Sequence, residues 1–286
     1  MSFEEAYKQK LLDTLRFTID FLEKNGLRYW TCGGTTLGAV RHHNIIPWDD
    51  DIDIYMPRDD YDKLCSMRNK LGDDYSFLMF GDSNYYCPFG KIIDNRTTLW
   101  EVDYLPYPIG AFVDVFPLDF YDLSDKDISK LQKKADVLFK IFLFSLEKRS
   151  FSFYFDLLKH GHLKFLSYYI KGKIFPESAK NRLKKHLQLC SELRGSKSCV
   201  CTTQWVGKIF DAKWFSSYEP CDFANLKVRN PLNTDQYLTL LYGNYLELPP
   251  AEKRVTPHHH YYVNLKEKVC FDEIKIRLQN GENCVW

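Results

Sequence analysis

Carboxylates gather in one short segment of the sequence, Trp48-Asp49-Asp50-Asp51-Ile52-Asp53-Ile54, and Asp114 stands about sixty residues downstream. From Asp51 onward polar and apolar residues alternate, which predicts a half-buried β-strand. Alternate residues of a strand point to the same face, so Asp49, Asp51 and Asp53 are expected to project together. Three carboxylates on one face repel one another unless a cation lies between them, and their oxygen atoms suit Mg²⁺ or Mn²⁺ rather than zinc. Asp114, from a neighbouring strand, would complete a site for one or two ions. The alternative is an acidic loop that leads into an exposed strand face.

A glycine- and threonine-rich segment, residues 33–38 (GGTTLG), lies between an expected strand at residues 28–32 and an expected helix start at residues 35–41. Glycine lets the backbone approach an anion closely, and a helix start offers free N–H groups and the positive end of the helix dipole. The same composition also occurs in strand-to-helix turns for steric reasons alone, and the spacing matches neither the P-loop nor the Rossmann motif. The candidate phosphate ligands in this segment are Gly33, Gly34 and Thr35.

Cationic side chains near these segments are candidate contacts to a phosphate group. Lys91 is either a phosphate ligand or a strand-edge lysine, and Arg41 either binds phosphate or pairs with a nearby aspartate. Arg254 and the three consecutive histidines, His258, His259 and His260, are candidate contacts to a donor or an acceptor molecule. For two of the three consecutive histidines, 258–260, an exposed loop is a sufficient interpretation.

The elements that must position these residues follow from hydrophobic periodicity. Apolar residues at helical spacing predict a helix over residues 4–25, with a stop at Asn25-Gly26. Pro57 is expected to end the acidic strand and Asp59 to cap the next helix. Strands alternate with helices over residues 1–120, which indicates an α/β or α+β sheet domain. Further strand-like runs lie at residues 76–80, 89–93, 98–102 and 112–116.

Residues 126–195 are helical in pattern, poor in Gly and Pro, and strongly basic, and strands and loops are expected again after residue 196. Residues 126–185 contain 15 Lys and Arg against 5 Asp and Glu, whereas the whole chain of 286 residues has a formal net charge of +1. Such asymmetry indicates a charged partner. The segment is either a helical layer with a solvated face or a surface for anionic lipid headgroups and a lipid-linked glycan. Nucleic acid is not expected, because no recognised binding motif accompanies the charge.

The compartment is inferred from three absences in the sequence. No run approaches the ~18 apolar residues of a spanning helix. The N-terminal segment carries charges throughout and lacks the apolar block of a signal peptide. The nine cysteines include no CxxC pair, and an odd count without a secretory signal favours reduced thiols. We expect a soluble, cytoplasmic protein, with peripheral contact at the inner face of the membrane as the further role of residues 126–185.

Taken together, residues 33–64 (GGTTLGAVRHHNIIPWDDDIDIYMPRDDYDKL) resemble the defining block of the LicD family, which pairs a GG[ST] turn with an acidic strand. The same pairing occurs in the polymerase-β-like nucleotidyltransferase superfamily and is shared with the fukutin-related proteins. The similarity touches residues 29–120 and 200–260 and leaves the basic segment outside it. Three further segments support the resemblance: residues 89–97 with Lys91, 110–119 with Asp114, and 242–258 with Arg254 and His258.

The resemblance implies an α+β fold, with a nucleotidyltransferase-like mixed sheet core flanked by helices and a basic helical insertion. The expected parts are a nucleotidyltransferase-like core (1–120), a basic helical insertion or subdomain (121–195) and a C-terminal part that completes the LicD-like domain (196–286). It also implies metal-dependent transfer of a phospho-alcohol, typically phosphocholine, from a CDP-activated donor. The acceptor is a hydroxyl of a cell-surface glycan or its lipid-linked precursor, such as lipopolysaccharide, teichoic acid or capsule polysaccharide.

On this hypothesis Asp51 and Asp53 hold Mg²⁺ or Mn²⁺ at the donor's diphosphate. Asp114 completes the metal shell or accepts the proton of the acceptor hydroxyl, and Asp49 is a further ligand or orients the others. One alternative is the transfer of ribitol or glycerol phosphate from the matching CDP donor. Another is NMP transfer by a nucleotidyltransferase, which shares the GG[ST] turn and the paired metal-binding aspartates. A non-enzymatic alternative is a membrane-docking scaffold, against which the intact aspartates argue.

Overall fold

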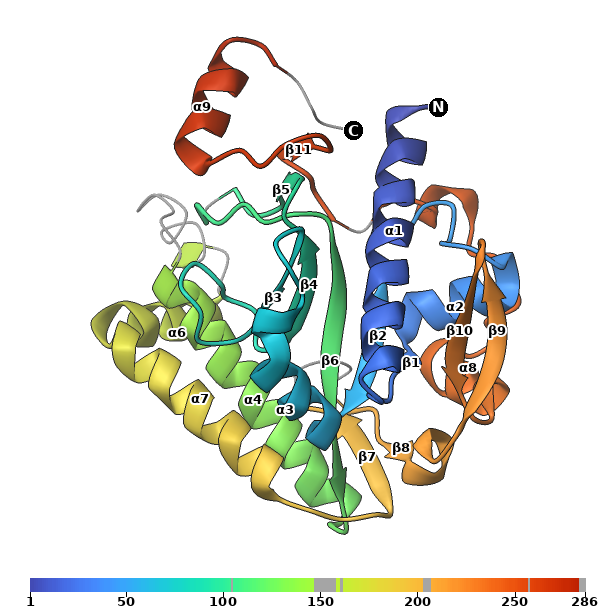
Figure 1. Ribbon diagram of the computed structural model, residues 1–286. Coiled ribbons are helices and arrows are strands. Elements are labelled where there is room, and N and C mark those ends of the chain that lie inside the picture. Colours follow the sequence, from blue (N-terminus) through green and yellow to red (C-terminus); the bar gives the residue numbers. More distant parts are fainter. Residues whose placement is uncertain (104, 147–157, 160–161, 203–206, 257, 283–286) are drawn as a thin grey trace.

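The computed structural model describes residues 1–286 except 104, 147–157, 160–161, 203–206, 257 and 283–286. Its architecture is mixed α/β, with a curled mixed sheet flanked by helices (Figure 1). This confirms the expected α+β fold class. The strands of the main sheet are β1 (Trp30–Thr31), β2 (Asp53–Pro57), β3 (Tyr75–Leu78), β4 (Gly90–Asp94), β6 (Phe112–Tyr121), β7 (Ser198–Cys201) and β8 (Phe210–Asp211).

Strand β6 is the centre of this sheet. The strands lie in the order β1-β2-β6-β4-β3, while β7 pairs with the last residues of β6 and β8 pairs with β7. β2 and β6 run parallel, and the other neighbouring strands run antiparallel. Segments far apart in the sequence, residues 53–57, 90–93 and 198–201, therefore meet on a single strand.

The N-terminal helix α1 (Phe3–Lys24) confirms the helix expected over residues 4–25. It begins with a capping box, in which the Ser2 hydroxyl accepts a hydrogen bond from the N–H of Glu5 and the Glu5 carboxylate accepts one from the N–H of Ser2. Its apolar stripe, with Leu11 and Leu15, belongs to the main core together with residues of β4 and β6. The helix lies across one face of the sheet (Figure 1).

Two shorter helices flank strand β2. Helix α2 (Gly33–His42) follows β1 directly, as the glycine-rich segment predicted. Along β2, Ile54 belongs to the main core, whereas Tyr55 belongs to a second cluster with residues of α2. Helix α3 (Arg58–Met67) and the 3₁₀ turn η1 (Arg68–Lys70) follow β2. The predicted cap at Asp59 is wrong: Pro57 occupies the N-cap position, and Asp59 lies in the first turn, where its charge still complements the helix dipole.

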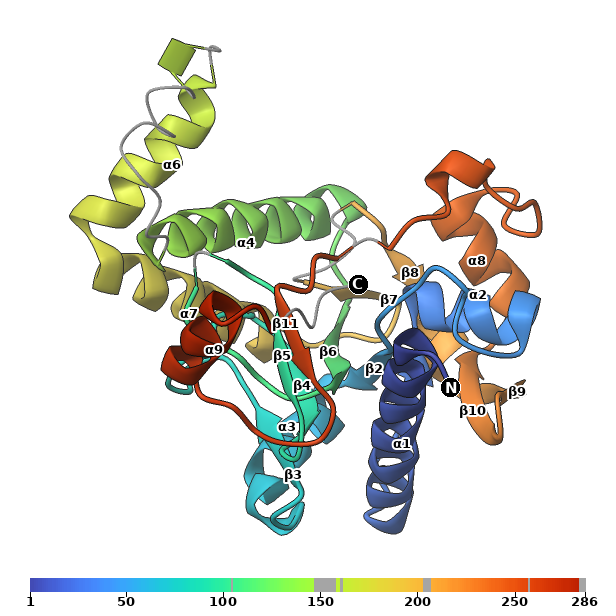
Figure 2. The ribbon, with the colours of Figure 1, turned by 90° about the horizontal axis from the view of Figure 1, so that it is seen from above.

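Three helices confirm that the described part of the basic segment is helical: α4 (Asp125–Leu146), α6 (Leu163–Ile174) and α7 (Pro176–Glu192). They lie together along one side of the sheet (Figure 1 and Figure 2). The buried Gln132 of α4 donates hydrogen bonds of 3.3 Å to the carbonyl oxygens of Cys201 and Lys208. These bonds join the basic helices to the C-terminal part of the sheet.

The C-terminal part contains helices as well as strands, so the expectation of strands and loops alone is wrong. Helices α8 and α9 have nine residues each, so each offers few apolar repeats and its helical period is hard to recognise in the sequence. Strands β9 and β10 form a hairpin, and β11 pairs with β5, which brings the C-terminal part back to the core. The bounds are β5 (Thr98–Trp100), η2 (Ala212–Phe215), β9 (Tyr218–Phe223), β10 (Leu226–Pro231), α8 (Thr234–Tyr242), η3 (Ala251–Lys253), β11 (Tyr262–Asn264) and α9 (Phe271–Gln279).

No described helix combines the length and the apolar composition that a segment crossing a bilayer requires.

Candidate active site

Three aspartates meet where β2 and β6 pair. The parallel register places Asp53 opposite Asp114, and Asp51 lies two residues before β2 begins. One carboxylate oxygen from each of the three lies within 4.8 Å of the others. The neighbouring-strand position predicted for Asp114 is therefore confirmed. The prediction that Asp49 and Asp51 share the strand with Asp53 is wrong in detail, because both lie in the loop that precedes it.

The cluster has the properties of a cation site. Asp53 and Asp114 are buried, and no hydrogen-bond donor from the described chain reaches the buried Oδ1 atom of Asp53. Burial raises the pKa of Asp53, and the charges of Asp51 and Asp114 raise it further. Burial likewise raises the pKa of Asp114 to about 7, although Lys91 opposes the shift. Buried carboxylates this close are stabilised by protons or by a cation, and an all-oxygen donor set suits a hard divalent metal.

Lys91 is part of this cluster. It lies opposite Asp114 on β4, and its Nζ is 2.6 Å from Asp114 Oδ1 and 3.2 Å from the ring centroid of Phe112. Burial favours the neutral amine, but the charges of Asp114 and Glu101 outweigh it and raise the pKa of Lys91. The strand-edge interpretation is excluded, because β4 lies between β3 and β6 and Lys91 is buried.

The glycine-rich turn holds the acidic strand in place. Gly33 has a left-handed backbone (φ 51°), and its N–H donates a 2.9 Å hydrogen bond to the Tyr237 hydroxyl. The Thr35 hydroxyl accepts a 2.8 Å hydrogen bond from the N–H of Asp53. A Cβ atom at Gly34 would lie 2.6 Å from Asp49 Oδ2, so a side chain there would displace Asp49. Of the three predicted phosphate ligands, only Gly34 lines a cleft, and the other two make internal hydrogen bonds.

Two clefts open beside the aspartates. The Trp48 cleft, of about 530 Å³, is lined by Trp48, Arg41, Asp49 and Asp53 among others. The Lys91 cleft, of about 370 Å³, is lined by Lys91, Glu101, Asp114 and His258 among others. Asp51 lines both clefts. The acidic cluster therefore stands at the junction of two spaces, each large enough for part of a substrate.

The Trp48 cleft has a cationic and aromatic rim. The guanidinium groups of Arg41 and Arg254 lie 5.8 Å and 5.6 Å from the centre of the Trp48 ring system. Arg41 donates a 2.8 Å hydrogen bond to the Tyr245 carbonyl oxygen, and Arg254 donates one of the same length to that of Pro249. The described aspartates and glutamates form no ion pair with Arg41, so the predicted Arg–Asp pair is not found.

Asp49 lies beside the three clustered aspartates, close enough to Asp51 for a side-chain hydrogen bond. It lines the Trp48 cleft, and its carboxylate is not among the oxygen atoms that approach one another in the cluster. Burial raises the pKa of Asp49 to about 8, and the neighbouring charges of Asp51 and Asp50 contribute to the shift.

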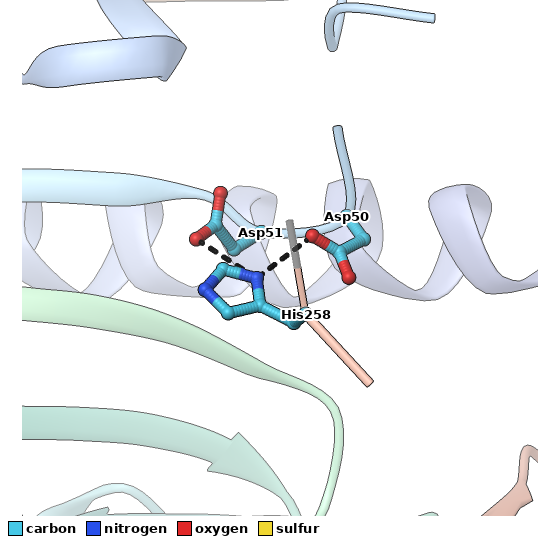
Figure 3. A group of neighbouring side chains, drawn as sticks. All are labelled: Asp50, Asp51 and His258. Atoms are coloured by element: carbon cyan, nitrogen blue, oxygen red, sulfur yellow. Dashed lines mark hydrogen bonds and ion pairs between the residues drawn. The ribbon is translucent and has the colours of Figure 1, made fainter. Parts of the chain in front are cut away.

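The Lys91 cleft is closed on one side by a carboxylate–histidine network. His258 Nδ1 lies 2.9 Å from Asp50 Oδ1 and 3.8 Å from Asp51 Oδ2 (Figure 3). His260 Nε2 lies 3.3 Å from Asp50 Oδ2 and 3.7 Å from Glu101 Oε1. The hydrogen bond to Asp50 raises the pKa of His258 to about 9 in spite of partial burial. His258 and His259 are exposed and His260 is buried, which confirms that two of the three consecutive histidines are exposed.

Comparison with known proteins identifies a family domain that contains the clustered aspartates. The protein-family model described as "LicD/FKTN/FKRP, nucleotidyltransferase domain" matches residues 26–155 of the sequence. The chain carries a LicD-family domain. The matched range contains Lys91 and all five aspartates discussed above, Asp49, Asp50, Asp51, Asp53 and Asp114, and it extends through α4. The expectation that the basic segment lies wholly outside the similarity is therefore wrong.

Two kinds of curated relatives are similar in sequence to this chain. The chain is 28% identical over 262 residues to the "Lipopolysaccharide cholinephosphotransferase LicD" of Haemophilus influenzae, which covers 87% of this chain and 92% of that protein. Over 91 residues it is 33% identical to the "Ribitol 5-phosphate transferase FKRP" of human and mouse, which covers 32% of this chain and 15% of those proteins. By name, both relatives are transferases, one of cholinephosphate and the other of ribitol 5-phosphate.

Two residues of the candidate site, Asp50 and Glu101, were not among those predicted from the sequence. Asp50 belongs to the acidic run, but strand alternation placed it on the face away from Asp49 and Asp51. Its partner His260 lies 210 residues downstream and was predicted only as one of the three consecutive histidines that could contact a donor or an acceptor. Glu101 lies two residues before Asp103 in a short strand-like segment, and no recognised motif there marked it as a site residue.

Proposed function

We propose that this chain is a metal-dependent phosphotransferase that moves a phospho-alcohol, foremost phosphocholine, from a CDP-activated donor to a hydroxyl group. The acceptor is a cell-surface glycan or its lipid-linked precursor. The observation that carries the proposal is the position of Asp51, Asp53 and Asp114 at the junction of two clefts, within a LicD-family domain. A transfer reaction needs two substrates at one cation site, and this arrangement offers a space for each.

Mg²⁺, or Mn²⁺ in its place, is the proposed cofactor, held by Asp51, Asp53 and Asp114. Asp114 has two carboxylate oxygens, and because Oδ1 pairs with Lys91, Oδ2 is the atom proposed as a ligand. When bound, the ion would neutralise negative charge on the donor's diphosphate and on the departing CMP. Asp49 is proposed to orient Asp51, to which it is close enough to hydrogen-bond.

The donor is assigned to the Trp48 cleft. The Trp48 ring can stack on a pyrimidine base, and Arg41 and Lys253, which line the same cleft, can pair with the diphosphate. Arg254 adds a second cation beside the ring. A volume of about 530 Å³ is in the usual range for a site that holds a small-molecule ligand. Gly34, at the start of α2 and without a side chain, would let phosphate oxygens approach the helix backbone.

The transferred group and the acceptor hydroxyl are assigned to the Lys91 cleft. Lys91 favours the ionised form of Asp114 and would place a positive charge beside the transferred phosphoryl group. His258 reaches the edge of the same cleft and is held there by Asp50, so that it can hydrogen-bond a phosphoryl oxygen or the incoming hydroxyl.

The experiment is a donor panel with the purified chain and Mg²⁺. Phosphate-labelled CDP-choline, CDP-ribitol, CDP-glycerol and the nucleoside triphosphates are each incubated with a glycan acceptor. Release of CMP with transfer of the labelled alcohol phosphate is the expected result. Label that appears on the acceptor as NMP would overturn the proposal in favour of a nucleotidyltransferase.

Ribitol phosphate is the second candidate group, favoured by the 33% identity to FKRP over 91 residues. The donor panel separates it from choline directly. A thermal-shift measurement adds an independent readout, since a ligand that binds only the folded state raises its apparent stability. If Asp51→Ala and Asp53→Ala retained turnover, the catalytic assignment would fail; if no donor were bound or turned over by the parent, the scaffold alternative would replace it.

A further inference from the structure

The outer face of helix α6 is apolar where a surface helix is usually polar. Its inner face packs against α4: Tyr168 and Gly172 are buried, and a Cβ atom at Gly172 would lie 2.5 Å from the Ile141 carbonyl oxygen. Leu163, Ile170 and Ile174 are 64%, 45% and 60% exposed. Their spacing of seven and then four residues places all three in one line along the helix, opposite Gly172.

Lysines border this apolar line on both sides. At about 100° per residue, Lys164 and Lys171 lie on one side of the line and Lys173 on the other, and α6 contains no Asp or Glu. Phe175, just after the helix, is 61% exposed and extends the apolar surface. We call this surface the α6 stripe: Leu163, Ile170, Ile174 and Phe175 with Lys164, Lys171 and Lys173.

The α6 stripe has an open and basic setting. Figure 2 shows α6 at the edge of the molecule, with α4 and α7 on its inner side. Helix α7 presents further exposed cations, Arg182, Lys184 and Lys185. Exposed apolar side chains in such a line are poorly solvated by water. The lysines on both sides of the line attract negatively charged groups.

We propose that the α6 stripe docks the protein on an anionic lipid bilayer. In this position Leu163, Ile170 and Ile174 would enter the boundary between headgroups and acyl chains, and Lys164 and Lys171 would reach outward to the lipid phosphates. Lys173, whose Nζ lies 3.4 Å from the Ser145 carbonyl oxygen, would exchange that contact for a lipid phosphate. The apolar line matches the acyl chains at the surface of a bilayer, and the lysines on both sides match its anionic headgroups. The surface is distinct from both clefts, so the docking stands independently of the proposed transfer reaction.

The test is co-sedimentation of the full chain with lipid vesicles. Vesicles of phosphatidylcholine alone are compared with vesicles that also contain phosphatidylglycerol, at low and at high salt. The expected result is binding to the anionic vesicles only, weakened by salt because the charges are at the surface. Equal binding to neutral and anionic vesicles, or no binding to either, would overturn the proposal.

Surface variants locate the contact on α6. The pair Ile170→Ser and Ile174→Ser is expected to lower vesicle partitioning by on the order of tenfold or more. Each of Lys164→Gln, Lys171→Gln and Lys173→Gln is expected to lower it roughly fivefold. The matched control is Ile276→Ser on α9, which is 57% exposed and should leave binding unchanged. An equal effect of Ile276→Ser would remove the assignment to α6.

Hydrogen exchange and sedimentation velocity test the α6 stripe in two further ways. Hydrogen exchange of the unsubstituted chain should slow in residues 163–174 when anionic vesicles are added, and unchanged exchange there would overturn the proposal without any variant. Sedimentation velocity without lipid tests the other occupant, a second copy of this chain. Self-association that is lost in the isoleucine pair would assign the stripe to a dimer interface instead.

Discussion

Replacing Lys91 with methionine tests whether this lysine is needed to balance the buried aspartates. The Lys91–Asp114 pair is short, at 2.6 Å, and the side chains are only 6% and 10% exposed. Methionine keeps the length and the contact with Phe112 but leaves Asp114 buried beside Asp53 without its cation. Breaking a buried pair from one side costs about 3–5 kcal/mol of unfolding free energy. In a chain of this size that corresponds to a fall in Tm of about 10 °C.

The assay is thermal unfolding followed by circular dichroism, with and without Mg²⁺. Mg²⁺ is expected to raise the Tm of Lys91→Met more than that of the parent, because a divalent cation can replace part of the lost charge. The matched control is Lys227→Met. Lys227 also pairs with an aspartate, Asp222, across neighbouring strands, but the two side chains are 76% and 62% exposed. An exposed pair contributes about 0–1 kcal/mol, so its loss should barely change the Tm.

A double variant completes the test. In Lys91→Met/Asp114→Asn no charge is left unpaired at that position, so it should be more stable than Lys91→Met alone. The reasoning is refuted if Lys91→Met melts with the parent, or if its loss of stability equals that of Lys227→Met. Reduced turnover with unchanged stability would mean that Lys91 acts only on the substrate.

Three further predictions concern Asp50 and Gly34 beside the cluster and Asp60 in the first turn of α3. Asp50→Asn removes the carboxylate that holds two histidines, so turnover should fall by about tenfold or more while donor binding by thermal shift is retained. Gly34→Ala should displace Asp49, since the new Cβ would lie 2.6 Å from its Oδ2, and should cost about 1–3 kcal/mol of stability, measured by urea unfolding. Burial favours the neutral form of Asp60, but hydrogen bonds from Arg28 outweigh it and lower the pKa of this carboxyl. A lowered pKa gives stability that is complete above the unfolded value of about 4 and is lost as the pH falls through the folded value. Asp60→Asn should therefore flatten the acid side of the stability–pH profile, and an unchanged acid side would contradict the assignment.

The acidic strand shows which part of a site periodicity can predict. Alternation identified β2, and a second aspartate strand downstream suggested a partner, which the parallel register of Asp53 and Asp114 confirms. The same alternation rule failed for the aspartates that precede the strand. Strand β2 begins at Asp53, so Asp49 and Asp51 follow a loop path that alternation does not describe.

The histidine network shows what periodicity cannot reach. Asp50 and His258 are 208 residues apart, and their contact depends on the return of the chain through β11 to β5. Nothing local to either residue encodes that return. The helix α6 is an intermediate case: its basic composition was visible in the sequence, but the apolar line became meaningful only when its inner face was seen packed against α4.

The loop before β2 explains how one site can serve two clefts. Asp53 and Asp114 are fixed by the sheet, and each lines a single cleft, whereas Asp51 stands in the loop and lines both. A loop residue can serve catalysis only if other contacts fix the position of the loop. Here those contacts are made by Asp50, the residue next to Asp51. The Tyr7 hydroxyl of α1 donates a hydrogen bond to the Asp50 carbonyl oxygen, and Asp50 in turn binds His258. Helix α1 therefore stabilises the position of Asp51 through Asp50, so that two strand carboxylates and one loop carboxylate lie together at the junction of the two clefts.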